Sequence, residues 1–137
     1  MSNLLSPPSL IPIRIAAVCA LVAGLIYFFK TTPMGYHQRF LQTPFAELPK
    51  TSQGLILALM HATGSGLICV GLTMSYLSWV MLPAHAPGAL TAAYIMVISA
   101  TTPMAMVTLT IGRYTPWWLI LGLGLGSIMG LWMFSLS

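Results

Sequence analysis

The sequence contains very little charge. Glu47 is the only acidic residue and five residues are basic, so charged side chains make up 4% of the 137 residues, whereas ordinary soluble domains have about 25%. So few charged side chains cannot cover the surface that a folded domain of this size exposes to water. The composition therefore excludes an ordinary water-soluble domain and predicts an integral membrane protein.

Catalytic signatures are missing as well. The chain has no GxSxG, HExxH or Walker glycine motif, and a single carboxylate leaves no partner for paired acid–base chemistry. Cys19 and Cys69 lie in apolar runs without a CxxC spacing, so we expect buried free thiols and neither a disulfide nor a metal site. These absences favour a non-catalytic protein without a metal or another cofactor.

Apolar runs long enough to cross a membrane occur four times. They cover residues 13–29, 54–80, 89–111 and 116–135. Three prolines in the first 12 residues predict an extended lead-in. Between the first two runs, apolar residues recur at three- to four-residue spacing but are interrupted by Pro44 and Pro49, which predicts a short amphipathic surface helix. We expect one domain, residues 1–137, that is an all-α four-helix transmembrane bundle.

The basic residues occur singly at the ends of the apolar runs. Lys30, Arg39, Lys50 and Arg113 fall on one side of the predicted bundle, and Arg14 falls on the other. Cytoplasmic loops carry the excess of Lys and Arg, so both termini are expected outside the cytoplasm. This spacing is typical of membrane orientation signals, and no nucleic-acid partner is expected.

The first candidate site lies inside the apolar runs. His61 is in the second run, and an ionisable group within a membrane helix is a functional candidate by default. In the third run Thr101 and Thr102 precede Pro103, which removes one backbone donor. These four residues could line a cavity in a small carrier or channel. The alternative is a neutral His61 imidazole that is hydrogen-bonded to a neighbouring helix.

A redox function is a further alternative, with His61 touching heme or quinone. A heme held by two histidines needs a second imidazole at the same depth. His37 and His85 lie in connections outside the runs, so heme held by this chain alone is not expected.

The second candidate site lies at the predicted membrane surface. Tyr36, His37, Arg39 and Glu47 combine a titratable imidazole, a cation and the only acid of the chain. They could form a site there. Alternatively, they include an ion pair that anchors the loop, and such surface pairs are common and weak.

Small residues recur every four positions in two of the runs. They are Ala58, Ala62 and Gly66 in the second run and Gly122, Gly126 and Gly130 in the fourth. Such faces allow another helix to approach closely. The expected partners are therefore the lipid bilayer and either other membrane subunits or a second copy of the chain. The expected function is that of an accessory or interaction subunit, or of a homo-oligomer.

The segment YHQRFLQTPFAELPKTSQGLILALMHATGSGLICVGL, residues 36–72, resembles a recurring type of small bacterial membrane protein. The matching positions are Tyr36, His37, Leu48, Pro49, Gly64 and Gly66. In size and span count the chain is similar to the DoxX-like four-helix proteins. The resemblance implies a bacterial inner membrane, with both termini periplasmic by the charge pattern. It implies no reaction.

Overall fold

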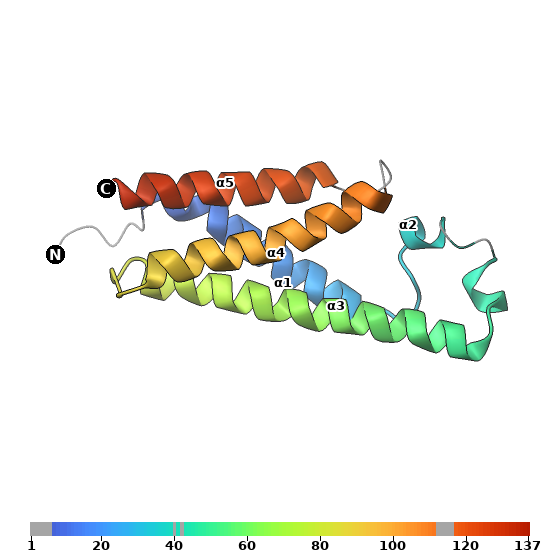
Figure 1. The fold of residues 1–137 in the computed structure, drawn as a ribbon. Coiled ribbons are helices and arrows are strands. Elements are labelled where there is room, and N and C mark those ends of the chain that lie inside the picture. The colour runs from blue at the N-terminus through green and yellow to red at the C-terminus, as the bar shows by residue number, and fades with distance from the viewer. Residues whose placement is uncertain (1–6, 40, 42, 112–116) are drawn as a thin grey trace.

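Four long helices make up most of the protein. The computed structural model describes residues 7–39, 41, 43–111 and 117–137. The long helices are α1 (Ile11–Phe29), α3 (Lys50–Tyr76), α4 (Ala89–Ile111) and α5 (Trp117–Ser135), and successive ones run in opposite directions (Figure 1). Each is long and apolar enough to cross a membrane. The predicted all-α fold with four such helices is confirmed.

Short helical turns connect and extend the long helices. They are η1 (Pro8–Leu10), α2 (Gly35–Gln38), η2 (Phe45–Glu47) and the π-helical segment η3 (Leu77–Met81), which continues α3. Pro44 precedes η2 and Pro49 precedes α3, since proline is favoured at the start of a helix, where its missing N–H would have no partner within the helix. The predicted amphipathic helix is therefore two separate single turns.

The predicted extended lead-in is wrong from Pro8 onward. Pro8 begins η1 and Pro12 lies in the first turn of α1. In that turn a proline costs nothing, because its missing N–H would have no partner in the helix anyway.

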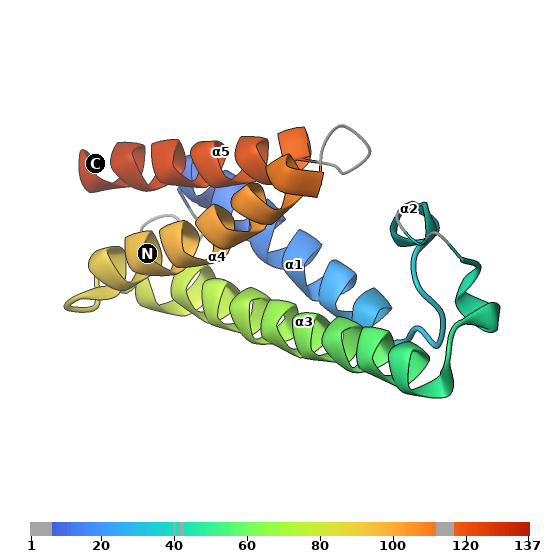
Figure 2. The same cartoon turned by 45° about the vertical axis from the view of Figure 1, so that its right-hand side comes forward.

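The apolar core fills one end of the bundle. Its residues are Leu10, Ile13, Ala17, Met74, Leu77, Leu82, Ala89, Ala93, Val97, Leu131 and Phe134. They come from the starts of α1 and α4, the ends of α3 and α5, and the turn at 82–88, and we call this the closed end. Toward the opposite end, which carries α2 and which we call the loop end, α4 diverges from α3 and stays with α5 (Figure 2).

The backbones of α1 and α3 touch along the length of α1. A Cβ atom at Gly64 would lie 2.6 Å from the Phe28 nitrogen and 2.8 Å from the Gly24 oxygen. One at Gly71 would lie 2.9 Å from the Ala17 oxygen. Side chains cannot occupy such positions, so glycine spacing along α3 sets how closely the two helices pack.

The small-residue face predicted on this helix is a different one. Ala58, Ala62 and Gly66 are all exposed, and a Cβ at Gly66 would meet nothing within 4 Å. Within the chain, α1 packs on Gly64 instead. Whether the predicted face binds a partner stays a prediction.

Only part of the predicted glycine stripe of α5 contacts another segment of the chain. A Cβ at Gly130 would collide with the Ser9 oxygen, and one at Gly126 would lie 3.7 Å from Pro12, whereas one at Gly122 would meet nothing within 4 Å. The start of α1 therefore packs on the closed-end half of the stripe.

Two neighbouring glycines of α3 provide a matched test of the α1–α3 contact. We expect Gly64→Ala to destabilise the protein by about 1–3 kcal/mol, because the added methyl group would push two backbones apart. Gly66→Ala is the control and should be neutral or stabilising by up to about 1 kcal/mol, since alanine favours a helix. Unfolding in detergent, followed by circular dichroism, measures both. Equal effects of the two changes would contradict the packing described.

Candidate functional site

His61 contacts the end of the neighbouring helix. Its Nε2 donates to the Lys30 carbonyl oxygen at 3.3 Å, and its ring lies 6.0 Å from that of Phe28. Lys30 follows the last residue of α1, where backbone carbonyls lack donors within the helix. Because a carbonyl only accepts, Nε2 must carry the proton. His61 thus caps α1, and its partner is this carbonyl and not a hydroxyl of α4.

The other members of the predicted intramembrane site lie elsewhere. Thr101 and Thr102 line a shallow hollow of about 270 Å³ between α4 and α5, and Pro103 is exposed beside it within α4. His61 is not among the residues that line this hollow. The structure therefore does not join His61 and the α4 hydroxyls in one cavity, as the carrier alternative requires.

Three side chains of the predicted surface site are described, those of His37, Arg39 and Glu47. His37, in α2, packs edge-on against Tyr27 with ring centroids 5.8 Å apart, and the Tyr27 oxygen lies 3.5 Å from His37 Nε2. Arg39 and Glu47 are exposed, at the ends of α2 and η2 respectively. The Tyr36 side chain lies outside the described part of the chain.

Both histidines near the loop end therefore contact the last turns of α1. Burial lowers the pKa of the His37 imidazole below its usual 6.5. A partly buried ring without its charge suits a packing contact, and the arrangement holds the connection between α1 and α3 in place.

Arg14 is a buried cation, whereas the sequence indicates it only as an orientation signal. Its side chain is 7% exposed, Nη2 donates to the Ser78 carbonyl at 2.8 Å, and the guanidinium carbon lies 4.0 Å from the centre of the Trp79 ring. Within the described residues its Nε has no hydrogen-bond partner.

The π-helical segment explains why Ser78 needs this donor. The Leu82 N–H donates to Leu77 and so skips the Ser78 carbonyl. The next residue, Pro83, has no N–H. The guanidinium supplies the missing donor. The sequence shows both a basic residue early in the first run and a proline just after the second, but only the packing of α1 on η3 pairs them.

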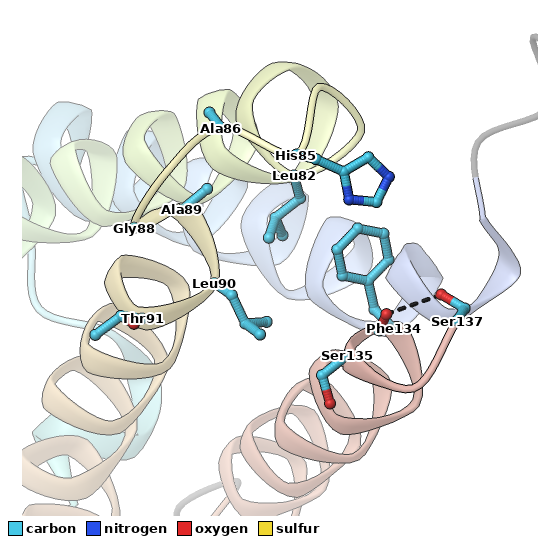
Figure 3. Close-up of a pocket in the computed structure, with 10 residues that line it drawn as sticks. All are labelled: Leu82, His85, Ala86, Gly88, Ala89, Leu90, Thr91, Phe134, Ser135 and Ser137. Carbon is cyan, nitrogen blue, oxygen red and sulfur yellow. Dashed lines mark hydrogen bonds between the residues drawn. The ribbon is translucent and has the colours of Figure 1, made fainter.

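A second feature that the sequence did not indicate lies at the closed end. His85 has a positive φ of 48°, and its ring stacks on that of Phe134 at 5.6 Å with 16° between the planes. Together with Leu82, Thr91 and Ser135 these rings line a hollow of about 290 Å³ (Figure 3).

The cysteines are free, as predicted, but they are not buried. Cys19 and Cys69 are both exposed on the outer surface of their helices. The expectation of buried thiols is wrong because it assumed that apolar positions face the interior, whereas here much of the outer surface is apolar.

Comparisons with protein families, with curated proteins and with solved structures find no match to this chain. The likeness to DoxX-like proteins therefore stays an expectation.

Among the described residues no three His, Cys, Asp or Glu side chains gather at one place. The arrangement supports packing and helix capping.

A double-mutant cycle tests the Arg14 contact. Arg14→Met, Trp79→Leu and the double variant should show a coupling of about 0.5–2 kcal/mol in the free energy of unfolding, because the cation lies over the ring face. The matched cycle of Arg14→Met with Trp132→Leu should show none, because among the described residues the guanidinium of Arg14 lies over the ring of Trp79 and Trp132 is on α5. Coupling of equal size in both cycles would contradict a direct contact.

The lowered pKa of His37 predicts a pH dependence. The folded protein binds this proton less tightly than the unfolded chain, so the contribution of His37 is complete above the unfolded value, about 6.5, and is lost as the pH falls toward the lowered pKa. Wild type should therefore lose more stability than His37→Asn between about pH 7.5 and about pH 5.5. An NMR titration of the His37 ring with its midpoint at or above 6.5 would disprove this.

Proposed function

We propose that this chain is an interaction subunit of a membrane, which binds a partner helix through the outward face of α3. The face consists of Ala58, Ala62 and Gly66, and we call it the α3 small face. The main observation behind the proposal is a contrast between two glycines of α3. The absence of a side chain at Gly64 lets α1 pack closely, whereas a Cβ atom at Gly66 would meet nothing within 4 Å.

Membrane insertion is supported by the outer surface. Large apolar side chains point outward along all four long helices; Leu125 is 66% exposed and Ile95 is 63% exposed. A surface of this kind would aggregate in water. In a bilayer such a surface faces hydrocarbon, and the helical hydrogen bonds satisfy the backbone groups inside each span.

The proposed location is a bacterial inner membrane with both termini in the periplasm. Lys30 and Lys50 flank the connection at the loop end, which also carries Arg39. At the closed end Arg14 is buried against Ser78 and Trp79. The excess of basic residues thus lies at the loop end, which the positive-inside rule assigns to the cytoplasm. Arg113 lies outside the described residues.

The first part of α3 supports a partner on this helix. The bond between His61 and Lys30 places the end of α1 beside His61, so residues 50–60 extend past it for about 16 Å at 1.5 Å per residue. Leu55 and Leu59 are each 60% exposed there. A helix that extends beyond its neighbour and exposes both small and large apolar residues can bind another helix there.

Cys69 allows a direct test. It is exposed and follows Ala62 by seven positions and Gly66 by three, so it lies on the same side of α3. A benzophenone attached through maleimide to Cys69, in a Cys19→Ser background, should form a covalent adduct with a protein when native membranes are irradiated. Gly66→Leu should remove the adduct without lowering the melting temperature, because the added side chain enters open space.

The matched control places the same probe on Cys19, which is exposed on α1, in a Cys69→Ser background. This position should give no such adduct. Mass spectrometry of the adduct distinguishes a second copy of the chain from another subunit. A probe at Cys69 that reacts only with lipid, or a protein adduct that survives Gly66→Leu, would refute the proposal.

A further inference from the structure

The Arg14 guanidinium has more hydrogen-bond donors than the fold uses. A guanidinium carries five N–H groups. Among the described residues its partners are the Ser78 carbonyl, which accepts from Nη2 at 2.8 Å, and the Trp79 ring, whose centre is 4.0 Å from the guanidinium carbon. In the same part of the chain the buried Nε has no hydrogen-bond partner. Arg14 therefore keeps donors of the kind that bind a carboxylate.

No acidic side chain of the protein lies at the same end as this cation. Glu47 is the only acidic residue of the sequence, and it is in η2 at the loop end. Among the described residues Arg14 forms no ion pair, and this includes the carboxylate of the last residue, Ser137. An arginine keeps its proton when it is buried, and a buried charge without a counter-charge is unfavourable. The charge balance therefore indicates an anion from outside the chain.

The guanidinium is held inside the apolar part of the first span. This span begins at Pro8, and Arg14 follows it by six residues, or about 9 Å at 1.5 Å per residue. The hydrogen bond to Ser78 holds the side chain at this depth. Lipid phosphates lie at the membrane surface, outside the hydrocarbon. A carboxylate carried by a membrane helix can lie at the depth of Arg14, and acidic residues within such helices pair with cations there.

Exposed apolar side chains flank the guanidinium on the outer surface. On α1, Ile11 and Val18 lie three residues before and four residues after Arg14, which places them on the same side of the helix. On η3, Trp79 and Val80 are exposed. We call the surface of these four apolar side chains the α1–η3 seam. An apolar surface beside a buried cation is complementary to an apolar helix that carries one acidic residue.

We propose that the α1–η3 seam binds a membrane helix of another protein through an ion pair between Arg14 and an acidic side chain of that helix. The partner's carboxylate accepts from the donors that Ser78 does not use. A second copy of the chain does not supply this group, because its only acidic side chain, on Glu47, lies in the connection between the first two spans.

The inference uses the proposed membrane location but not the α3 small face. Cys19, the control position for cross-linking, is five residues after Arg14 and so points about 140° away from it on α1. A partner at the seam is therefore compatible with the absence of an adduct from Cys19.

A model membrane helix tests the ion pair. The probe is a synthetic leucine–alanine helix with either Glu or Gln at the depth of Arg14, in phosphatidylcholine vesicles that contain the whole protein. Energy transfer from a dye on Cys19, in a Cys69→Ser background, to a dye on the peptide measures association. At about pH 8, where pairing with a cation keeps the carboxyl group ionised, the Glu helix should bind at least about tenfold more tightly than the Gln helix.

Variants of Arg14 identify the cation. Arg14→Gln, which keeps a donor for Ser78, should reduce the preference for the Glu helix to less than about twofold, whereas Arg14→Lys keeps the charge and should retain part of it. Arg39→Gln, at the loop end, is the matched control and should leave the preference unchanged. Moving the Glu of the peptide by two turns, about 11 Å, should remove it. The comparison of the two peptides needs no change at Arg14, so it remains decisive if a variant unfolds.

Three results would overturn the inference: equal binding of the Glu and Gln helices, a preference that survives Arg14→Gln, or a preference that does not depend on the depth of the Glu. Loss of the preference when phosphatidylglycerol replaces phosphatidylcholine would assign the guanidinium to a lipid phosphate and would also overturn it. Cross-linking from Cys69 reports on the α3 small face, so failure here and failure of the proposed partner face are distinguishable.

Discussion

The direct contact between the backbones of α1 and α3 is the constraint on which the rest of the structure depends. At Gly24 and Gly64 no side chain separates the two helices. Such contact brings main-chain atoms of the two helices together over a long line. It also fixes the register of the pair: Lys30 comes to lie beside His61 at one end, and Arg14 beside Ser78 at the other.

The polar side chains of this nearly uncharged protein serve mainly to satisfy backbone groups. His61 donates to a carbonyl beyond the last turn of α1, and Arg14 donates to the carbonyl that the π-helical segment and Pro83 leave without a partner. In an apolar surrounding an unpaired carbonyl costs several kcal/mol. The two bonds therefore give an imidazole and a guanidinium in apolar helices a structural role.

The helices could be predicted from the sequence, but their contacts could not. The run at 89–111 coincides with α4, because the length and composition that allow a membrane crossing leave a clear pattern. No sequence pattern shows whether α1 packs on Gly64 or on Gly66. Residues two apart point about 200° away from each other, and both glycines lie on a face of small residues. Likewise, the partners of Arg14 and the stacking of His85 on Phe134 depend on helices that are distant in sequence.

The outer surface along α3 differs from the outer surface along α4 and α5. Along α3 the small face offers a nearly smooth helix side, on which a second helix gains contact at short range. Along α4 and α5, the large side chains of Ile95 and Trp132 are exposed, and two hollows lie along the contact between these helices. The glycines that α1 requires, at Gly64 and Gly71, face neither surface, so either surface can change without loosening the α1–α3 contact.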